Sequence, residues 1–384
     1  MNEQNKQWDD VSLRSVQIKT TDLASYTASE RIWQGIPGIC WAGGDRLLAT
    51  WYSGGTTEGP DNYILVGQSD DFGKTWQEPV AVVAPDGQVR AFDSTIWRDP
   101  SGQVWLFWAQ GWSPEDLKIW DGRAGVWCSV CKDPTADQLI WSEPRRLSDG
   151  IMLNKPYVTA TGDWLLPVSI WNLEPFHPQT EGRRLAGLVV SRDSGKTFQW
   201  VGGVQILSNA YDEHVIFERG HDDLVLWSRT CDGMAQSTSS DGGITWAQSF
   251  KNGMTCPNSR FSIARMPNGK LLHATHIEPD MKKSTYVDCC KVSTWHGRNN
   301  LGVMLSDDDG QTWSAQCMID QRQGVSYPDV DVTPDGRIVM IYDYDRFGQG
   351  QINVAVMSEQ DILQSRCPGH TTISKLEAVD TVGM

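Results

Sequence analysis

The sequence contains no long apolar stretch. No run among its 384 residues approaches the 18 or more apolar residues that a membrane-spanning helix needs. Residues 1–10 are polar and lack the apolar core of a secretory signal peptide. These absences predict a cytoplasmic protein with no membrane partner.

A block of Lys and Arg residues is also missing. The formal net charge is −15, with 33 Lys and Arg against 48 Asp and Glu. A protein field of this sign repels phosphate backbones and anionic lipids, so we expect no nucleic-acid partner. A neutral ligand, or an acidic one held by a local cluster of positive charge, fits the composition better.

Metal-binding patterns are equally scarce. Nine Cys residues are scattered along the chain, and Cys128 and Cys131 have no second pair at similar spacing, which a zinc site of four Cys requires. We interpret this pair, and the adjacent Cys289 and Cys290, as free thiols. No His pair forms the HExxH motif of zinc hydrolases. The sequence therefore predicts neither a metal nor a cofactor.

One turn motif recurs four times. The pattern Ser-x-Asp-x-Gly-x-Thr, followed by Trp or Phe, occupies 69–76, 191–198, 239–246 and 306–313. The Asp can accept N–H groups of the turn, the Gly permits a positive φ, and the Thr and the aromatic residue begin the next strand. We expect the aromatic side chain to fill the space between neighbouring sheets.

A second repeat, a turn that precedes an apolar strand, runs in phase with the first. Four of its copies lead to the intact motifs, one leads to a degenerate motif at 131–144, and the last leads to Ser358 alone. Six units of roughly 50–65 residues predict an all-β, six-bladed β-propeller with four strands in each blade. The six copies lie at 42–45, 99–102, 161–163, 220–223, 266–269 and 333–336.

The propeller is expected to form a single domain over residues 1–384, because no linker or low-complexity stretch divides the chain. The apolar runs between the paired turns are continuous, which is typical of inner strands covered on both faces. Residues 16–20 are expected to supply a strand that pairs with the last blade and closes the ring. The sequence leaves open whether the protein forms a homo-oligomer. The blades are predicted at 21–80, 81–145, 146–200, 201–250, 251–315 and 316–384.

Asp-box turns at this spacing resemble those of the sialidase (neuraminidase) superfamily and its relatives with BNR repeats. The likeness covers nearly the whole chain and implies a sialidase-like propeller. The boxes imply a fold rather than an activity, because in this family they lie on the blade rims, away from the axis.

The resemblance also implies individual site residues. Tyr327 stands where the family has its Tyr nucleophile, and Glu213 precedes Arg229 at the spacing of the Glu that activates this Tyr. Arg298 stands where a further family Arg precedes an Asp box. These matches predict a catalytic Tyr–Glu pair and two Arg residues that bind the substrate.

At two other positions this chain differs from the family pattern or offers more than one candidate residue. The family's acid/base Asp lies on the loop before the first box, where this chain has both Glu58 and Asp61, and the sequence does not choose between them. The family's first Arg directly precedes an Ile-Pro pair, and Gly35 stands there instead. The chain therefore lacks one member of the three-Arg clamp with which the family binds a sialate carboxylate.

Polar residues beside the inner strands of different blades converge on one funnel even when they are far apart in sequence. His214 is among them, as either a proton carrier or a hydrogen-bonded neighbour of Glu213. The other expected substrate-binding residues are Arg90, Asp93, Asn154, Lys155, Arg260, Asp329 and Arg346.

Two functions of different class fit these residues. In the first, the chain is an exo-glycosidase in which Tyr327, helped by Glu213, attacks the anomeric carbon of a terminal sugar. In the second, it is a uronate-directed lyase or a non-catalytic sugar-binding propeller that uses Tyr327, His214 and Lys155. Both imply a carbohydrate partner. A hydrogen-bond distance between Tyr327 and Glu213 would favour the first function.

Overall fold

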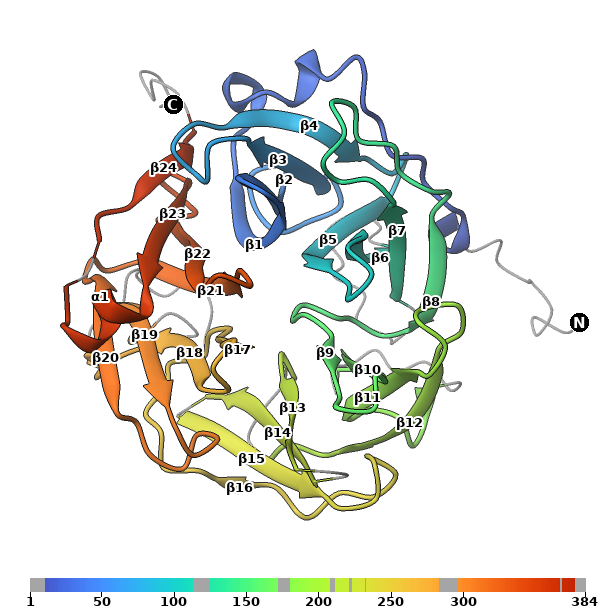
Figure 1. Ribbon diagram of the computed structural model, residues 1–384. Helices are drawn as coiled ribbons and strands as arrows, with labels where there is room; N and C mark the ends of the chain where they lie inside the picture. The colour runs from blue at the N-terminus through green and yellow to red at the C-terminus, as the bar shows by residue number, and fades with distance from the viewer. Residues whose placement is uncertain are drawn as a thin grey trace, which may run out of the picture.

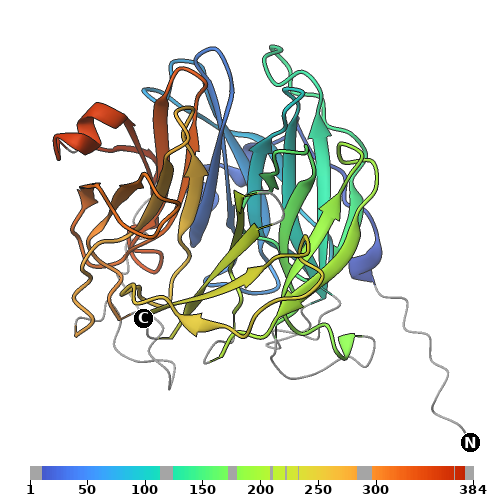
Figure 2. The same ribbon diagram turned by 60° about the horizontal axis from the view of Figure 1, so that its bottom comes forward.

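Six antiparallel sheets of four strands surround a common axis in the computed structural model (Figure 1). The structure describes residues 11–112, 124–171, 180–207, 211–220, 223–231, 233–282, 296–366 and 368–376. In Figure 2 the strands of the blades run between the two faces of the disc. The fold is therefore the all-β, six-bladed propeller that the repeats predict.

Each blade is built from four consecutive strands, and the first strand of each lies nearest the axis (Figure 1). Blades 1 to 3 contain β1 (Gln34–Gly43), β2 (Arg46–Ser53), β3 (Tyr63–Ser69) and β4 (Gln77–Val83); β5 (Val89–Arg98), β6 (Val104–Trp112), β7 (Gly125–Cys131) and β8 (Arg145–Asp149); β9 (Tyr157–Val158), β10 (Trp164–Ser169), β11 (Ala186–Ser191) and β12 (Gln199–Val204). Blades 4 to 6 contain β13 (Val215–Gly220), β14 (Asp223–Thr230), β15 (Gly233–Ser239) and β16 (Phe250–Lys251); β17 (Ser262–Arg265), β18 (Leu271–His276), β19 (Leu301–Ser306) and β20 (Ala315–Asp320); β21 (Val325–Val332), β22 (Arg337–Tyr344), β23 (Gln351–Ser358) and β24 (Thr371–Ser374).

The ring closes in a different way from the one expected for residues 16–20. Lys19 forms a β-bridge with Val82, at the outer edge of blade 1, through two N–H···O bonds of 2.9 Å. The last blade already takes its fourth strand, β24, from the chain's own C-terminal region, so no position is left for an N-terminal strand. Side-chain bonds from Arg31 and Gln34 to Ser374, at 3.1 and 3.0 Å, connect the first blade to the last.

The Asp boxes form the turns between the third and fourth strands. In the first box, Ser69 Oγ accepts the N–H of Gly73 at 2.8 Å, and Asp71 Oδ1 accepts the N–H of Thr75 at 2.8 Å. The Thr75 hydroxyl donates to the second oxygen of Asp71 at 2.6 Å, and Gly73 has a φ of 88°. The other three boxes repeat the bonds from the Thr to the Asp.

The aromatic residues that end the boxes lie between blades, as expected. Trp76 packs against a cluster that joins blades 1 and 6, and Phe198 packs against one that joins blades 2 and 3. Trp246 and Trp313 pack in the same way between blades 3 and 4 and between blades 4 and 5. Each box therefore contributes both a turn and a part of the apolar contact between sheets.

Short helices complete the described chain. Where the last box is reduced to Ser358, this residue caps α1 (Glu359–Leu363): its hydroxyl accepts the N–H of Asp361, and Asp361 accepts the N–H of Ser358 at 2.8 Å. Within the described ranges, no helix is long and apolar enough to cross a membrane. The single-turn 3₁₀ helices are η1 (Val11–Leu13), η2 (Ala24–Tyr26) and η3 (Ala28–Glu30).

Of the two closely spaced cysteine pairs, one lies within the described residues and the other lies outside them. Cys128 and Cys131 are free thiols on β7, as expected, while Cys289 and Cys290 lie outside the described residues. Cys317 on β20 is disulfide-bonded.

Replacing Asp193 with Asn tests the Asp box as a source of stability. The Thr197 hydroxyl and N–H groups of the turn hold the pKa of Asp193 at about 2, below its ordinary value. A lowered carboxyl pKa stabilises the fold above the unfolded-state pKa, and that stability is lost as the pH falls through the folded-state pKa. Thermal unfolding should show a Tm deficit for Asp193→Asn at pH 7 that disappears toward pH 2. A deficit that is constant over this range would contradict the prediction.

Candidate functional site

The residues expected to be functional lie on one face of the propeller, opposite the Asp boxes. In each antiparallel blade the start of the first strand lies beside the end of the second, as the pairing of Val325 with Tyr344 shows. Glu213 precedes β13, Arg229 lies near the end of β14, and Tyr327 lies near the start of β21. Each Asp box follows the end of a third strand, at the other face of the disc, so the expected site residues and the boxes occupy separate faces.

Three neighbouring inner strands carry the same distortion. β1, β5 and β21 each have a register shift that surrounds one non-glycine residue with a positive φ: Ile36 at 60°, Asp93 at 46° and Tyr327 at 54°. Such a backbone costs about 1–3 kcal/mol and concentrates at functional sites. Because the register shifts match, Asp93 in blade 2 and Tyr327 in blade 6 occupy equivalent positions. A β-bulge changes the direction of the side chain that it carries.

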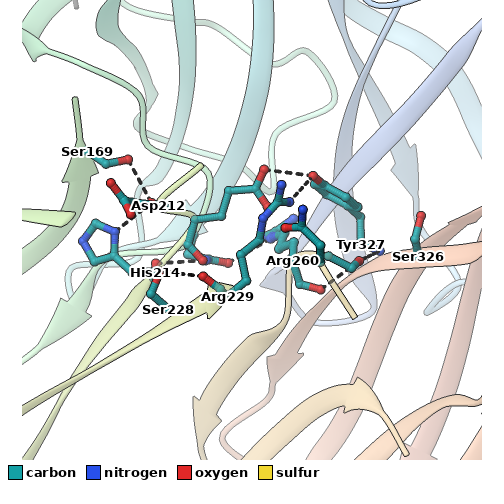
Figure 3. A network of polar contacts seen from close by, with 12 residues as sticks. Ser169, Asp212, His214, Ser228, Arg229, Arg260, Ser326 and Tyr327 are labelled. Atoms are coloured by element: carbon teal, nitrogen blue, oxygen red, sulfur yellow. Dashed lines mark hydrogen bonds and ion pairs between the residues drawn. The ribbon is translucent and has the colours of Figure 1, made fainter. Parts of the chain in front are cut away.

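Tyr327, Glu213 and Arg229 form a closed triangle of short contacts. The Tyr327 hydroxyl donates to Glu213 Oε1 at 2.9 Å, while Arg229 Nη1 donates to the Tyr327 oxygen at 2.6 Å and to Glu213 Oε2 at 2.5 Å. Figure 3 shows Arg229 and Tyr327 directed toward each other from different blades. Burial raises the pKa of Tyr327 above its ordinary value, and the positive charge of Arg229 opposes this rise. The structure thus joins the expected Tyr–Glu pair.

Three guanidinium groups surround the ring of Tyr327. Their central carbons lie 5.9 Å (Arg229), 5.2 Å (Arg298) and 4.2 Å (Arg346) from the ring centroid. Arg298 also donates to the carbonyl of Asn258 at 2.8 Å. Burial lowers the pKa of Arg298 to about 10, and the charges of Arg346 and Arg229 act in the same direction. Arg229 is paired with Glu213, and Arg346 is paired with Asp343 and Glu58. Guanidinium groups held in this way can recognise a carboxylate through charge-assisted hydrogen bonds.

The expected acid/base residues lie in different environments. Asp61 is exposed, whereas Glu58 is partly buried and lies 3.5 Å from Arg346 Nη1. Asn62 holds their loop by accepting the N–H of Gly59 at 2.7 Å and donating to the carbonyl of Gly54 at 2.7 Å. The loop between β2 and β3 therefore brings Glu58, rather than Asp61, into contact with the Arg cluster.

Arg90 and Asp93 lie at the start of β5, on the same face. Arg90 donates to Asn62 Oδ1 at 3.0 Å and packs over the ring of Phe92, so it supports the loop that carries Glu58. Burial raises the pKa of Asp93 to about 7; the charges of Glu213 and Glu58 add to this rise. Asp93 was expected among the substrate-binding residues, but its raised pKa and its place in a bulge equivalent to that of Tyr327 indicate a more specific role.

Four other expected substrate-binding residues form a network beneath the site instead. Asp329 accepts the N–H of Ile39 at 2.9 Å and lies 3.1 Å from Lys155 Nζ and 3.2 Å from Arg260 Nη2. Arg260 also donates to Asn154 Oδ1 at 2.8 Å. The side chains of Asp329 and Arg260 have no exposed surface, so the structure assigns this network to contacts between blades rather than to a substrate.

His214 turns away from the Tyr–Glu pair. Its Nδ1 lies 2.9 Å from the carbonyl of Asp212, and its Nε2 lies 2.8 Å from the carbonyl of Gly187 on β11 (Figure 3). Burial lowers its pKa. Both ring nitrogens are directed at backbone carbonyls, so the geometry favours a structural role for His214 over that of a proton carrier. The contact with Gly187 connects blade 4 to blade 3.

No group of three or more His, Cys, Asp or Glu side chains is placed to hold a metal ion in the described part of the chain. The polar groups near Tyr327 are instead guanidinium and carboxyl groups that pair with one another. This set suits the recognition of an anionic organic ligand and proton transfer by carboxyl groups.

Replacing Asp329 with Asn should destabilise the fold strongly. The change removes the negative charge opposite the buried Arg260 and the partly buried Lys155. Breaking a buried ion pair typically costs about 3–5 kcal/mol. Urea unfolding should show this loss, while Asp137→Asn, at an exposed position, should leave the free energy of unfolding unchanged. Equal stability of the two variants would show that Asp329 does not hold the blades together.

Replacing Asp93 with Asn should change how stability depends on pH. In the folded protein the pKa of Asp93 is about 7, so the carboxyl group keeps its proton up to that pH, whereas in the unfolded chain it loses the proton near its ordinary pKa of 3.8. The raised pKa therefore lowers the stability of the wild type as the pH rises between these values. The Tm of Asp93→Asn, relative to wild type, should increase from pH 4 to pH 7 and then level off. A difference independent of pH would contradict the raised pKa.

Comparison with known proteins agrees with the fold. Residues 45–340 match the family model described as a BNR repeat-like domain. No curated protein sequence matches the chain significantly. Among solved structures, the Hadza microbial sialidase Hz136 has a TM-score of 0.67 and 16% identity, with 88% of this chain and 69% of that chain covered.

Two further structures are similar. A protein of unknown function from Dyadobacter fermentans has a TM-score of 0.63 and 17% identity, with 89% of this chain and 98% of that chain covered. The Trypanosoma rangeli sialidase in complex with sialic acid has a TM-score of 0.60 and 14% identity, with 82% of this chain and 52% of that chain covered. The family match spans more than half of the sequence, and the chain belongs to the BNR repeat-like domain family, with the propeller fold of the sialidase superfamily.

Proposed function

We propose that the protein is an exo-acting, retaining glycosidase that hydrolyses a terminal acidic sugar. The observation that carries this proposal is the contact of 2.9 Å between the Tyr327 hydroxyl and Glu213, within a cluster of three Arg residues. A hydroxyl that donates to a fixed carboxylate is the arrangement of an activated nucleophile. The fold shared with sialidases agrees with this chemistry but does not carry it.

Tyr327 is the nucleophile in this proposal. As its oxygen attacks the anomeric carbon, its proton passes to Glu213, and Arg229 stabilises the negative charge that develops on the oxygen. Burial favours the neutral phenol in the resting state, so proton transfer accompanies attack rather than preceding it. The glycosyl–Tyr intermediate is then released by water, which retains the anomeric configuration.

An acidic sugar fits the electrostatics of the site. The phenol is uncharged before attack and does not repel a neighbouring carboxylate, as a carboxylate nucleophile would. Arg298 and Arg346 lie within reach of the same ring and can bind a carboxylate by charge-assisted hydrogen bonds. The substrate class we propose is therefore a glycoside with a carboxylate on its terminal ring.

The leaving oxygen requires a proton donor. Glu58 and Asp61, on the loop between β2 and β3, are the carboxyl groups that the sequence offers for this role. Asp93 is a third candidate, since a carboxyl group with a pKa of about 7 is partly protonated at neutral pH. Of the three, Glu58 contacts Arg346, and Asp93 occupies the bulge equivalent to that of Tyr327.

The lyase alternative has less support from the geometry. It relied on His214 and Lys155 as proton-transfer groups beside a uronate. His214 faces two backbone carbonyls, and Lys155 Nζ lies 2.5 Å from the carbonyl of Val330 and 3.1 Å from Asp329. Neither group is directed toward the hydroxyl of Tyr327.

Replacing Tyr327 with Phe should abolish turnover. Purified protein should be screened with fluorogenic aryl glycosides of acidic and neutral sugars, and with a uronate polymer whose cleavage by a lyase produces an absorbing unsaturated product. On the best glycoside, Tyr327→Phe should lower kcat by roughly 1000-fold or more, because the covalent route is lost. Mass spectrometry of a slowly released fluorosugar should place the label on Tyr327.

Tyr342→Phe is the matched control for this experiment. It removes a buried hydroxyl that donates to Asp320 at 2.9 Å, between blades 5 and 6, and should leave kcat unchanged. If Tyr327→Phe kept more than about a tenth of the wild-type rate, a loss below about 1.4 kcal/mol, Tyr327 would be a binding residue. Formation of the unsaturated product by wild type would support the lyase instead.

A further inference from the structure

Gly35 is a glycine for reasons of space rather than of backbone conformation. Its φ lies outside the left-handed region that favours glycine. A Cβ atom at this position would lie 2.8 Å from Cδ and 2.9 Å from Nε of Arg346. These distances are shorter than those that real Cβ atoms show. The space that a side chain at position 35 would enter is therefore occupied by Arg346, from the opposite end of the sequence.

The position of Arg346 is set by the strand that precedes it. Asp343, near the end of β22, accepts from Arg346 Nε at 2.8 Å and from the N–H of Ile36 at 2.8 Å. The same carboxylate accepts from the hydroxyl of Ser326 at 2.7 Å. Asp343 thus fixes Arg346 against both the bulge that follows Gly35 and the bulge that carries Tyr327.

Arg346 has a guanidinium group that belongs to the site. Its central carbon is the nearest of the three Arg carbons to the Tyr327 ring centroid, at 4.2 Å. Its Nη1 lies 3.5 Å from Glu58, which is an ion pair at the long limit of a hydrogen bond. An incoming carboxylate can compete with Glu58 for this nitrogen, which would leave Glu58 available near the leaving group.

We propose that Arg346 supplies, from the sixth blade, the guanidinium that the first blade lacks at position 35, and that Gly35 makes the room it needs. With Arg298, it binds the carboxylate of the acidic sugar. The identity of this ligand rests on the proposed function. The dependence of Arg346 on Gly35 does not, because it follows from the packing of the two residues alone.

A double-mutant cycle tests the packing. Gly35→Ala should lower the Tm of the wild type, because the new methyl group and the Arg346 stem cannot share the space. In an Arg346→Ala background the same change should have little effect. Gly220→Ala, at a glycine of ordinary φ with nothing within 4 Å of the added Cβ, is the matched control and should leave Tm unchanged in both backgrounds.

A binding experiment tests the role of the guanidinium. Calorimetry would use the 2,3-unsaturated analogue of sialic acid as the free carboxylate and as its methyl ester. Arg346→Ala should weaken binding of the carboxylate by roughly 10- to 100-fold, and that of the ester much less. Gly35→Ala should show the same selective loss. The exchange variant Gly35→Arg with Arg346→Ala should recover part of the preference for the carboxylate.

The outcomes separate this inference from the proposed function. Wild-type Tm and binding for Gly35→Ala would overturn the dependence of Arg346 on Gly35. An unchanged carboxylate preference in Arg346→Ala would overturn its role in binding. A wild type that binds neither probe and cleaves no acidic glycoside would contradict the proposed ligand, and with it the carboxylate role of Arg346. The Tm cycle would still decide the packing of Gly35 and Arg346.

Discussion

The buried carboxylate of Asp329 is the contact on which the arrangement of the inner strands depends. It receives the N–H of Ile39 from blade 1, the hydroxyl of Ser262 from blade 5, and the charges of Lys155 and Arg260 from the segments that lead into blades 3 and 5. A propeller has few covalent constraints between blades, so separate sheets must be positioned by packing and by such shared polar groups. A carboxylate without solvent is tolerated only because each of its oxygens is paired.

The same strand carries both this contact and the site. Between Ser326 and Asp329 the register of β21 shifts, and Tyr327 within the bulge adopts a φ of 54°. The bulge directs Tyr327 toward Glu213 and Arg229, while Asp329, two residues later, enters the network between blades. The unusual backbone at Tyr327 and the ion pairs of Asp329 therefore lie two residues apart on the same strand.

The net charge of −15 is compatible with the acidic ligand proposed above, because charges at different places in the fold are screened to different extents. The Asp-box carboxylates are exposed or partly exposed and lie on the face opposite the site, where solvent screens them. The guanidinium groups of Arg229, Arg298 and Arg346 are buried, so their field is screened less. The proposed acidic ligand would therefore meet the local arrangement of guanidinium and carboxyl groups at Tyr327 rather than the total charge of the protein.

The sequence by itself determined the fold, and its resemblance to the sialidase superfamily predicted that Tyr327 and Glu213 would form a pair. Asp boxes are local: each Ser, Asp, Gly and Thr bonds within its own turn, so the pattern can be recognised without tertiary contacts. Its four intact copies, together with the six copies of the second repeat, give the number of blades. Only the tertiary structure decided that residues 16–20 join blade 1, that His214 faces carbonyls, and that Asn154, Lys155, Arg260 and Asp329 hold blades together. It alone placed Arg346 beside Gly35, because the two are separated by nearly the whole chain and meet only where the first and last blades close the ring.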